Sequence, residues 1–222
     1  MTLAIETRRL TKFYGPSKGL ARRGTRGIED LDLGVKPGEV FGFLGPNGAG
    51  KTTTIRILLD FIRPTSGEAR VLGMDCRSDS VAIRRRVGYL PGELATYDHL
   101  TGRELFIHLG SLRGGVVRAS FEHLSERLKF DLDRRTGVLS KGNKQKAGVI
   151  QAFMGDPEMI ILDEPTAGLD PLMQEEVHGL ILEAARAGRT VFLSSHILSE
   201  AESMCRRVGI IRDGSLVAVE AV

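Results

Sequence analysis

The stretch Gly45-Pro46-Asn47-Gly48-Ala49-Gly50-Lys51-Thr52 matches the phosphate-binding pattern G-x-x-x-x-G-K-[ST]. A short, mostly apolar run, residues 39–44, precedes it, and apolar residues at helical spacing follow it, which places the pattern between a strand and a helix. The glycines let successive backbone N–H groups point at phosphate oxygens, Lys51 neutralises the β- and γ-phosphates, and the Thr52 hydroxyl can ligate Mg²⁺. This phosphate loop, residues 45–52, therefore predicts a binding site for ATP and magnesium.

The composition is that of an ordinary globular protein. Of the 222 residues, 41% are hydrophobic and 27% charged, and the net charge of +3 is too small to indicate a nucleic-acid-binding protein. Cys76 and Cys205 lie far apart, which favours reduced thiols over a disulfide or a metal pair and predicts an intracellular protein. We find no apolar run near the roughly 18–20 residues that cross a bilayer. Work at a membrane would therefore require another protein as the anchor.

Hydrophobic patterning divides the chain into three parts. Alternation over residues 3–10 and 28–35 predicts half-buried antiparallel strands, and residues 101–154 have mostly helical spacing. Short apolar runs in the last third are typical of buried parallel strands; they cover residues 159–162, 190–193 and 208–211. Strands alternating with helices predict an α/β fold with a mostly parallel core, an N-terminal antiparallel part and a helical insertion. We expect one domain, residues 1–222, with a core of 1–91 and 156–222 and a helical part of 92–155.

A second candidate element is Met159-Ile160-Ile161-Leu162-Asp163-Glu164, four apolar residues that end in two carboxylates. Alone, this pattern is as typical of an ordinary strand followed by an acidic turn as it is of a strand that ends at a phosphate site. Together with the phosphate loop, it places Asp163 where it would hold Mg²⁺ and Glu164 where it would face the γ-phosphate and polarise the attacking water.

Two further segments indicate a function only when they are considered together with the phosphate loop and the Asp163 strand. Ser140 is a good N-cap, and Gly142 leaves backbone N–H groups uncovered at a helix start, although a routine capped helix has the same pattern. His196 follows another core strand, expected beside the Asp163 strand, so its ring could reach the γ-phosphate. A lone histidine there would more often be structural.

Taken in order, these features resemble the ATP-binding cassette family, the nucleotide-binding subunits of ABC transporters. The resemblance covers essentially the whole chain and implies a P-loop NTPase (RecA-like) fold. Tyr14 matches the aromatic that stacks on adenine, residues 45–52 the Walker A loop, and residues 160–164 the Walker B strand. The signature motif, the D-loop and the switch histidine match residues 140–145, residues 166–170 and His196. The resemblance extends the nucleotide-binding set to Thr53, Ser140, Gly142 and Asp170.

The sequence departs from the family pattern at two places. The usual signature Leu-Ser-Gly-Gly-Gln is replaced by Leu139-Ser140-Lys141-Gly142-Asn143, which keeps the phosphate-facing Ser140 and Gly142. Gly92 stands where the family normally places glutamine, and Glu93 is the candidate to replace it in contacting Mg²⁺ or the water. Both variants resemble those of bacterial drug, antibiotic and ion exporters whose ATPase and membrane subunits are separate chains.

The resemblance implies a mechanism and partners. Two copies would pair head-to-tail, with each ATP between the phosphate loop of one copy and Ser140 and Gly142 of the other. Glu164 would act as base, with His196 and Lys51 on the developing charge. A separate transmembrane permease would dock on the helical part after Glu93. We therefore expect a cytoplasmic protein, peripheral on the inner face of the cell membrane, with no direct nucleic-acid contact.

Two alternatives remain open at this stage. One is a soluble ABC ATPase without a transport role, acting on nucleic acid or the ribosome, for which basic residues at 22, 23, 26 and 84–86 are available. Solvated surface charge is the favoured interpretation of those residues. The other is a nucleotide-gated switch without useful turnover, which Gly92 permits. The transported substrate cannot be inferred from this chain.

Overall fold

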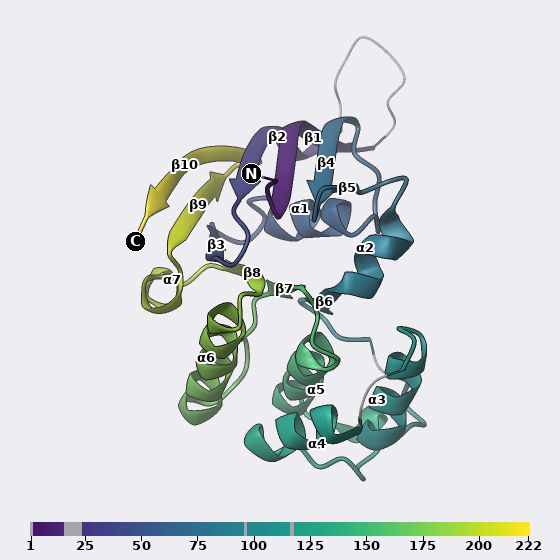
Figure 1. The fold of residues 1–222 in the computed structure, drawn as a ribbon. Coiled ribbons are helices and arrows are strands. Elements are labelled where there is room, and N and C mark those ends of the chain that lie inside the picture. The colour runs from purple at the N-terminus through teal and green to yellow at the C-terminus, as the bar shows by residue number, and fades with distance from the viewer. Residues whose placement is uncertain (1, 16–23, 96, 116–117) are drawn as a thin grey trace.

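The computed structural model describes residues 2–15, 24–95, 97–115 and 118–222 of the chain. It contains two β-sheets and a group of helices below them in the view of Figure 1. Of the basic residues considered above, Arg22 and Arg23 lie outside the described residues. The strands are β1 (Ile5–Tyr14), β2 (Thr25–Val35), β3 (Val40–Leu44), β4 (Ser66–Val71), β5 (Met74–Asp75), β6 (Val87–Leu90), β7 (Met159–Asp163), β8 (Thr190–Ser195), β9 (Arg207–Arg212) and β10 (Ser215–Ala221). The helices are α1 (Lys51–Leu58), α2 (Ser80–Arg86), α3 (Gly102–Ser111), α4 (Arg118–Arg127), the 3₁₀ turn η1 (Thr136–Val138), α5 (Lys141–Phe153), α6 (Pro171–Arg186) and α7 (Leu198–Met204).

The larger sheet has the strand order β10-β9-β3-β8-β7-β6. All its neighbouring strands pair in parallel except β10, which is antiparallel to β9. The carboxyl ends of β3, β8 and β7 therefore meet at one edge of the sheet, where α/β proteins bind their ligands. The phosphate loop leaves β3 at this edge.

Side chains of the central strands alternate between two apolar layers. On β7, Ile160 and Leu162 face the helical layer, while Met159 and Ile161 belong to the layer that contains α1. All five residues of the strand are buried, as the apolar run predicts for a parallel strand covered on both faces. Full burial of each large side chain contributes roughly 1.5–3 kcal/mol. The second layer closes against the smaller sheet, so α1 lies between the two sheets (Figure 1).

The smaller sheet has the order β2-β1-β4-β5 and is antiparallel throughout. The predicted strand at residues 3–10 is longer than expected, because β1 continues to Tyr14, which pairs with Thr25. Register shifts after Thr7 and Leu10 interrupt the strict alternation there, and for this reason the pattern ends early. The α/β fold with an antiparallel N-terminal part and a mostly parallel core is confirmed.

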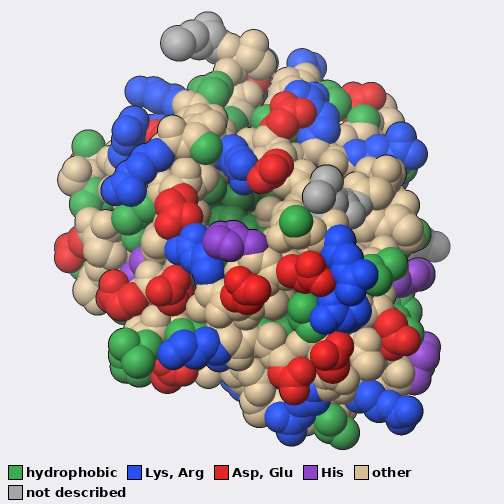
Figure 2. Space-filling view, turned by 60° about the horizontal axis from the view of Figure 1, so that its bottom comes forward, with side chains coloured by type: hydrophobic (Ala, Val, Ile, Leu, Met, Phe, Trp, Pro, Cys, Tyr) green, Lys and Arg blue, Asp and Glu red, His purple; other side chains and the backbone are tan. Residues whose placement is uncertain are grey.

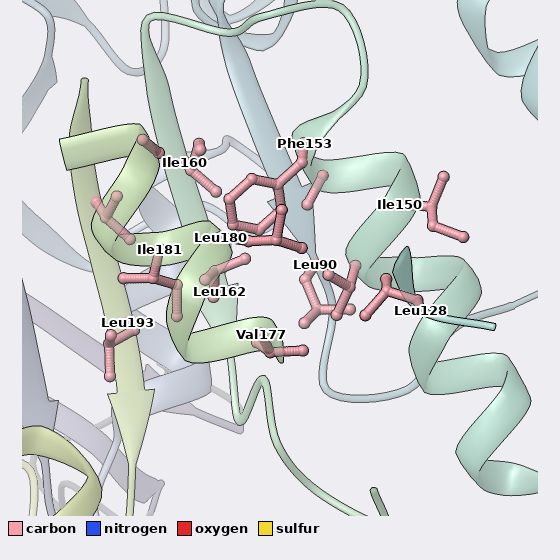
Figure 3. Packing of buried hydrophobic residues seen from close by; sticks show 14 of the residues in the cluster. Leu90, Leu128, Ile150, Phe153, Ile160, Leu162, Val177, Leu180, Ile181 and Leu193 are labelled. Carbon is pink, nitrogen blue, oxygen red and sulfur yellow. The ribbon is translucent and has the colours of Figure 1, made fainter. Parts of the chain in front are cut away.

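The helical part is connected to the core through α5 and α6. Figure 3 shows Phe153 of α5 beside Leu180 of α6 and Ile160 of β7, so the two helices and the strand share one apolar layer. Thr101 begins α3 with a capping box, in which its hydroxyl accepts from the Glu104 N–H and the Glu104 carboxylate accepts from the Thr101 N–H. Among the described residues, no helix is long and apolar enough to cross a membrane.

Charged side chains of both signs are mixed on one face of the molecule. On the face shown in Figure 2, acidic and basic side chains alternate over short distances around a central hollow that exposes hydrophobic atoms. This pattern agrees with a net charge of only +3.

Candidate active site

The phosphate loop has a backbone that only glycine allows at its last turn. Gly50, the N-cap of α1, has φ +111°, and a Cβ there would lie 2.6 Å from the carbonyl oxygen of Gly27. Gly48 also has a positive φ, +80°. These two glycines turn the chain sharply from β3 into α1, so that the loop's backbone N–H groups and the N-terminus of α1 form one anion-binding surface.

Lys51 is a buried cation held at this surface. Its ammonium group donates to the carbonyl oxygens of Gly45, at 2.6 Å, and Pro46, at 3.3 Å, and the side chain is only 6% exposed. It also lies 3.3 Å from Oε1 of Glu164. The positive charge is therefore fixed over the loop by the loop's own carbonyls, where it can meet a phosphate.

Thr52 and Asp163 form the site that suits a magnesium ion. The Thr52 hydroxyl donates to Asp163 Oδ2 at 2.8 Å, and the Ser194 hydroxyl donates to Asp163 Oδ1 at 2.5 Å. Asp163 is 1% exposed, so its carboxylate is oriented by these two bonds at the end of β7. Mg²⁺ prefers oxygen ligands and commonly binds to one or two protein side chains together with phosphate oxygens and water. A hydroxyl and a carboxylate beside a phosphate-binding loop fit that requirement.

Glu164 has a strained backbone that its neighbours hold in place. Its φ is +54°, unusual for a residue other than glycine. Its N–H group is bonded to the side-chain oxygen of Ser194 at 3.1 Å, and its carbonyl oxygen accepts from Gln145 Nε2 at 2.9 Å. Strain of this kind persists only where the surroundings fix it, and it is common at functional sites.

The Glu164 side chain lies between two groups that carry or can carry a positive charge. Oε2 is 2.8 Å from Nδ1 of His196, while Oε1 faces Lys51 at 3.3 Å without the geometry of a hydrogen bond. Within the described residues, Oε1 is buried and has no hydrogen-bond partner. A buried carboxylate oxygen left without a donor indicates a place for a polar ligand.

A cavity of about 270 Å³ joins these groups to the smaller sheet. Tyr14, Glu164 and most of the phosphate loop line it. The Tyr14 hydroxyl is 3.1 Å from Oγ1 of Thr53, the residue is 39% exposed, and the Lys12 ammonium lies 5.4 Å from the ring centroid. The structure thus brings together Tyr14, Thr53, the phosphate loop, Asp163, Glu164 and His196.

Three predicted residues lie apart from this cavity. Ser140 caps α5 by accepting from the Asn143 N–H at 3.3 Å, and Asp170 caps α6 by accepting from the Met173 N–H at 3.1 Å. Gly142 packs against the loop before α6, since a Cβ there would lie 3.0 Å from the Gly168 carbonyl oxygen. Ser140, Gly142 and Asp170 therefore form a second group, at the N-terminal ends of α5 and α6, that does not line the cavity of its own chain.

The segment after β6 leaves the Glu93 prediction open. Gly92 lies beside Asp163, because a Cβ at Gly92 would be 3.3 Å from Asp163 Oδ2. Glu93 is exposed, and within the described ranges it forms no hydrogen bond or ion pair. Its contact with magnesium stays a prediction.

Two residues of the site were missed from the sequence. Ser194 reaches Asp163 because β7 and β8 pair with Asp163 opposite Ser194. Gln145 reaches from α5 to the carbonyls of both Glu164 and Pro165, at 2.9 Å each. The position of Ser194 at the end of a strand beside β7 was a usable signal, whereas nothing local in the sequence indicated the reach of Gln145.

Comparison with known proteins identifies the family of the chain. Residues 28–167, more than half of the chain, match the family model described as ABC transporter. The chain is 39% identical over 220 residues to the bacitracin transport ATP-binding protein BcrA of Bacillus licheniformis, covering 98% of this chain and 69% of that protein. It is 38% identical over 223 residues to the daunorubicin/doxorubicin resistance ATP-binding protein DrrA of Streptomyces peucetius, covering 98% of this chain and 65% of that protein.

A solved structure shows the same fold. It is described as a dimeric ATP-binding cassette in a post-hydrolysis state bound to ADP and Pi, with a TM-score of 0.87, 22% identity and 98% of each chain covered. The family and the fold class predicted from the sequence are both confirmed. Because a family model matches more than half of the chain and the relatives are close to 40% identical, the chain belongs to the ABC transporter family, as an ATP-binding domain.

Proposed function

We propose that this chain is the ATP-binding and hydrolysing subunit that powers export through a separate membrane permease. The names of the two relatives support transport of antibiotics or drugs, although the chain spans only 69% and 65% of their lengths. The substrate would contact the permease, so the cargo is left unassigned. The rest of the proposal rests on this chain's own residues.

The observation that carries hydrolysis is the Glu164 oxygen that accepts no hydrogen bond. Oε1 is buried, has no hydrogen-bond partner within the described residues and lies 3.3 Å from the Lys51 ammonium, while Oε2 contacts His196. Glu164 also lines the cavity beside the phosphate loop. Glu164 takes a proton from the attacking water as that water's oxygen bonds to the γ-phosphorus. The bond between the γ-phosphorus and the β–γ bridging oxygen breaks, and that oxygen leaves with its electron pair as part of ADP. Lys51 and His196 stabilise the charge that develops on the phosphate oxygens.

Thr52 and Asp163 are the residues that would hold magnesium. When bound, the ion neutralises charge on the β- and γ-phosphate oxygens. Ser194 keeps the Asp163 carboxylate in place through its hydrogen bond, and burial prevents that carboxylate from turning away. Tyr14, in the same cavity, would bind the adenine ring.

The separation between the two groups of residues supports a head-to-tail dimer. Ser140, Gly142 and Asp170 lie outside the cavity that contains Lys51 and Glu164. A second copy would place its own Ser140 and Gly142 over the nucleotide and complete each site. ATP would then stabilise the dimer, and hydrolysis would release it.

We expect the permease to bind in a groove of about 670 Å³ that Val87 and Tyr89 of β6 help to line. It lies between the end of α1, α2 and α3, and its apolar surface includes Phe61, Tyr97 and Leu112, all exposed. Arg84 and Arg113 line it and donate to backbone carbonyls, of Leu59 and Val87. No lining residue is acidic among those described. We expect a short permease helix with apolar residues and a carboxylate, which would hold the subunit at the inner face of the cell membrane.

The test is the Glu164→Gln variant beside the wild-type chain. Wild type should hydrolyse ATP in a magnesium-dependent manner, whereas E164Q should bind ATP, form a dimer and lose turnover by about 10³-fold. Glu220→Gln on β10, an exposed carboxylate, is the matched control and should behave as wild type.

Two results would contradict parts of the proposal. Rapid hydrolysis by E164Q would remove Glu164 from its role as base. A wild-type chain that binds ATP yet shows no turnover, with or without its permease, would instead be a nucleotide-gated switch. Dimerisation is measured by light scattering with and without ATP.

A further inference from the structure

Glu200 on α7 connects the two loops that carry Glu164 and His196. Its Oε1 accepts from the Thr166 hydroxyl at 2.7 Å, and its Oε2 accepts from the Ser195 hydroxyl at 3.0 Å. Thr166 lies in the loop after β7, and Ser195 is the last residue of β8. One carboxylate thus binds two nearly inaccessible hydroxyls from separate strand ends.

The Thr166 bond fixes the turn that begins at Glu164. In that turn the Ala167 N–H donates to the Glu164 carbonyl at 3.2 Å, and the Leu169 N–H donates to the Thr166 carbonyl at 3.1 Å. Glu164 has a positive φ, so its side-chain direction depends on how this turn is held. Glu200 contacts this turn through the Thr166 side chain, whereas Gln145 contacts its backbone carbonyls.

The Ser195 bond fixes the turn around His196. The Ser195 side-chain oxygen accepts from the Ile197 N–H at 3.0 Å, which closes a short turn with His196 at its centre. The same hydroxyl donates to Glu200, so the carboxylate fixes the side chain that closes this turn. The Ile197 carbonyl, 3.4 Å away, is a more distant acceptor for that proton, and we expect the proton to turn to it when Glu200 is removed.

These contacts connect back to the contact between Glu164 and His196. Glu164 and His196 meet side chain to side chain at 2.8 Å, and Glu200 joins the turns from which both side chains extend. A carboxylate that only capped α7 would have no need of Thr166, which lies 34 positions away in the sequence. Its two oxygens instead set the relative position of the base and the histidine.

We propose that Glu200 is a positioning residue, which holds the Glu164 and His196 turns in the relative orientation that hydrolysis requires. The inference rests on the proposed roles of Glu164 and His196. Glu200 lines no part of the nucleotide cavity, so it acts on turnover through these two residues and leaves ATP binding unchanged.

The first experiment compares Glu200→Ala, Glu200→Gln and a control, Glu202→Ala. Glu202 is exposed on the same helix and has no hydrogen-bond or ion-pair partner in the part of the chain that the structure describes. E200A should lower kcat about tenfold with an unchanged KM for ATP, because it removes the acceptors of both hydroxyls. E200Q should recover to within about threefold of wild type, since an amide can accept from one hydroxyl and donate to the other. E202A should match wild type.

A double variant separates positioning from a general structural role. In a His196→Ala background, E200A should lower kcat by much less than it does in wild type, because the position of Glu164 relative to the His196 ring then no longer affects turnover. An equal tenfold loss in that background would overturn the inference, as would full activity of E200A alone. Thermal unfolding of each variant shows whether a loss of kcat only reflects a loss of folded protein.

A second readout does not depend on hydrolysis. In protein with isotope-labelled histidine, the His196 ring signals are identified by their absence in His196→Ala. E200A should shift these signals in the nucleotide-free protein, whereas E200Q and E202A should shift them little. Unchanged His196 signals in E200A would overturn the inference even if the wild-type chain proves inactive, and that inactivity would count against the proposed function alone.

Discussion

The phosphate site and the apolar groove beside α2 and α3 differ in how their charged side chains are partnered. At the phosphate site, the buried Lys51 lies beside the partly buried Glu164, and the buried Asp163 accepts hydrogen bonds from two hydroxyls. In the groove, Arg84 and Arg113 donate to backbone carbonyls, and Leu112 is 65% exposed. Burial lowers the pKa of Arg113, and no carboxylate in the described lining offsets that cost.

This difference indicates how each hollow is completed. Polar groups that are already oriented within one chain can stabilise charge on a ligand without further reorganisation. Exposed apolar side chains beside unpaired cations gain stability only when another surface covers them. We therefore interpret the first hollow as prepared for a small anionic ligand and the second as half of a protein interface.

The largest expected effect comes from breaking the phosphate site at Lys51. Lys51→Ala removes a buried cation whose bonds to a phosphate would be charge-assisted, so ATP affinity should fall about a hundredfold or more. Nucleotide binding by titration calorimetry measures the change. Lys36→Ala, at an exposed lysine before β3, is the control and should bind ATP as wild type does. Near-normal affinity in K51A would show that the loop's backbone alone binds the phosphates.

The sequence could predict those site residues whose role is set by their neighbours in the chain. Lys51 and Thr52 belong to one continuous pattern, and Asp163 and Glu164 end an apolar strand, so each could be predicted from its neighbours. The role of Ser194 depends on the register of β7 against β8. That register is a tertiary property, and a shift of one residue would turn the side chain to the opposite face.

The same limit applies to the fold. Buried parallel strands were predicted from apolar runs that only a core tolerates, as at residues 159–162. The strand β4 was missed, because its burial pattern is mostly exposed and its place in the sheet depends on pairing with β1. The length of β1 was underestimated, since its second half pairs across register shifts. Elements held by distant partners rather than by their own periodicity are the ones that sequence patterns miss.

A smaller effect is expected at the groove. Leu112→Asp places a charge on an apolar, exposed surface, so binding to the permease should weaken about tenfold while ATP hydrolysis by the isolated subunit is unchanged. Val217→Asp on β10 is a matched control, since Val217 is 64% exposed and lies outside the groove. Co-purification with the permease over a concentration series measures both. Equal binding by the two variants would place the interface elsewhere.

The smallest effect is expected where charges are paired but exposed. Arg127 of α4 donates to both oxygens of Glu183 on α6, at 2.6 and 3.0 Å, and this pair connects the helical part to the core. The hydrogen bond from Arg127 holds the pKa of Glu183 below its usual value near 4.5, so the stabilisation is present at neutral pH and is lost as the pH falls below about 4.5. Glu183 is 53% exposed, so solvent screens the pair, and Glu183→Gln should lower the free energy of unfolding by only about 0.5 kcal/mol at pH 7.

Urea unfolding of E183Q at pH 7 and near pH 4 measures this difference, with Glu175→Gln as the control. Glu175 is exposed on the same helix and, within the described residues, has no ion-pair partner, so its variant should match wild type at both values of pH. The gap between wild type and E183Q should shrink as the pH falls, because protonated Glu183 no longer carries the charge that Arg127 attracts. A loss of several kcal/mol at pH 7 would contradict the comparison. The exposed pair between α4 and α6 would then contribute as much free energy as the charged groups at the phosphate site. A loss of about 0.5 kcal/mol would instead agree with the view that a charged group contributes more free energy when it is buried, as Lys51 and Asp163 are.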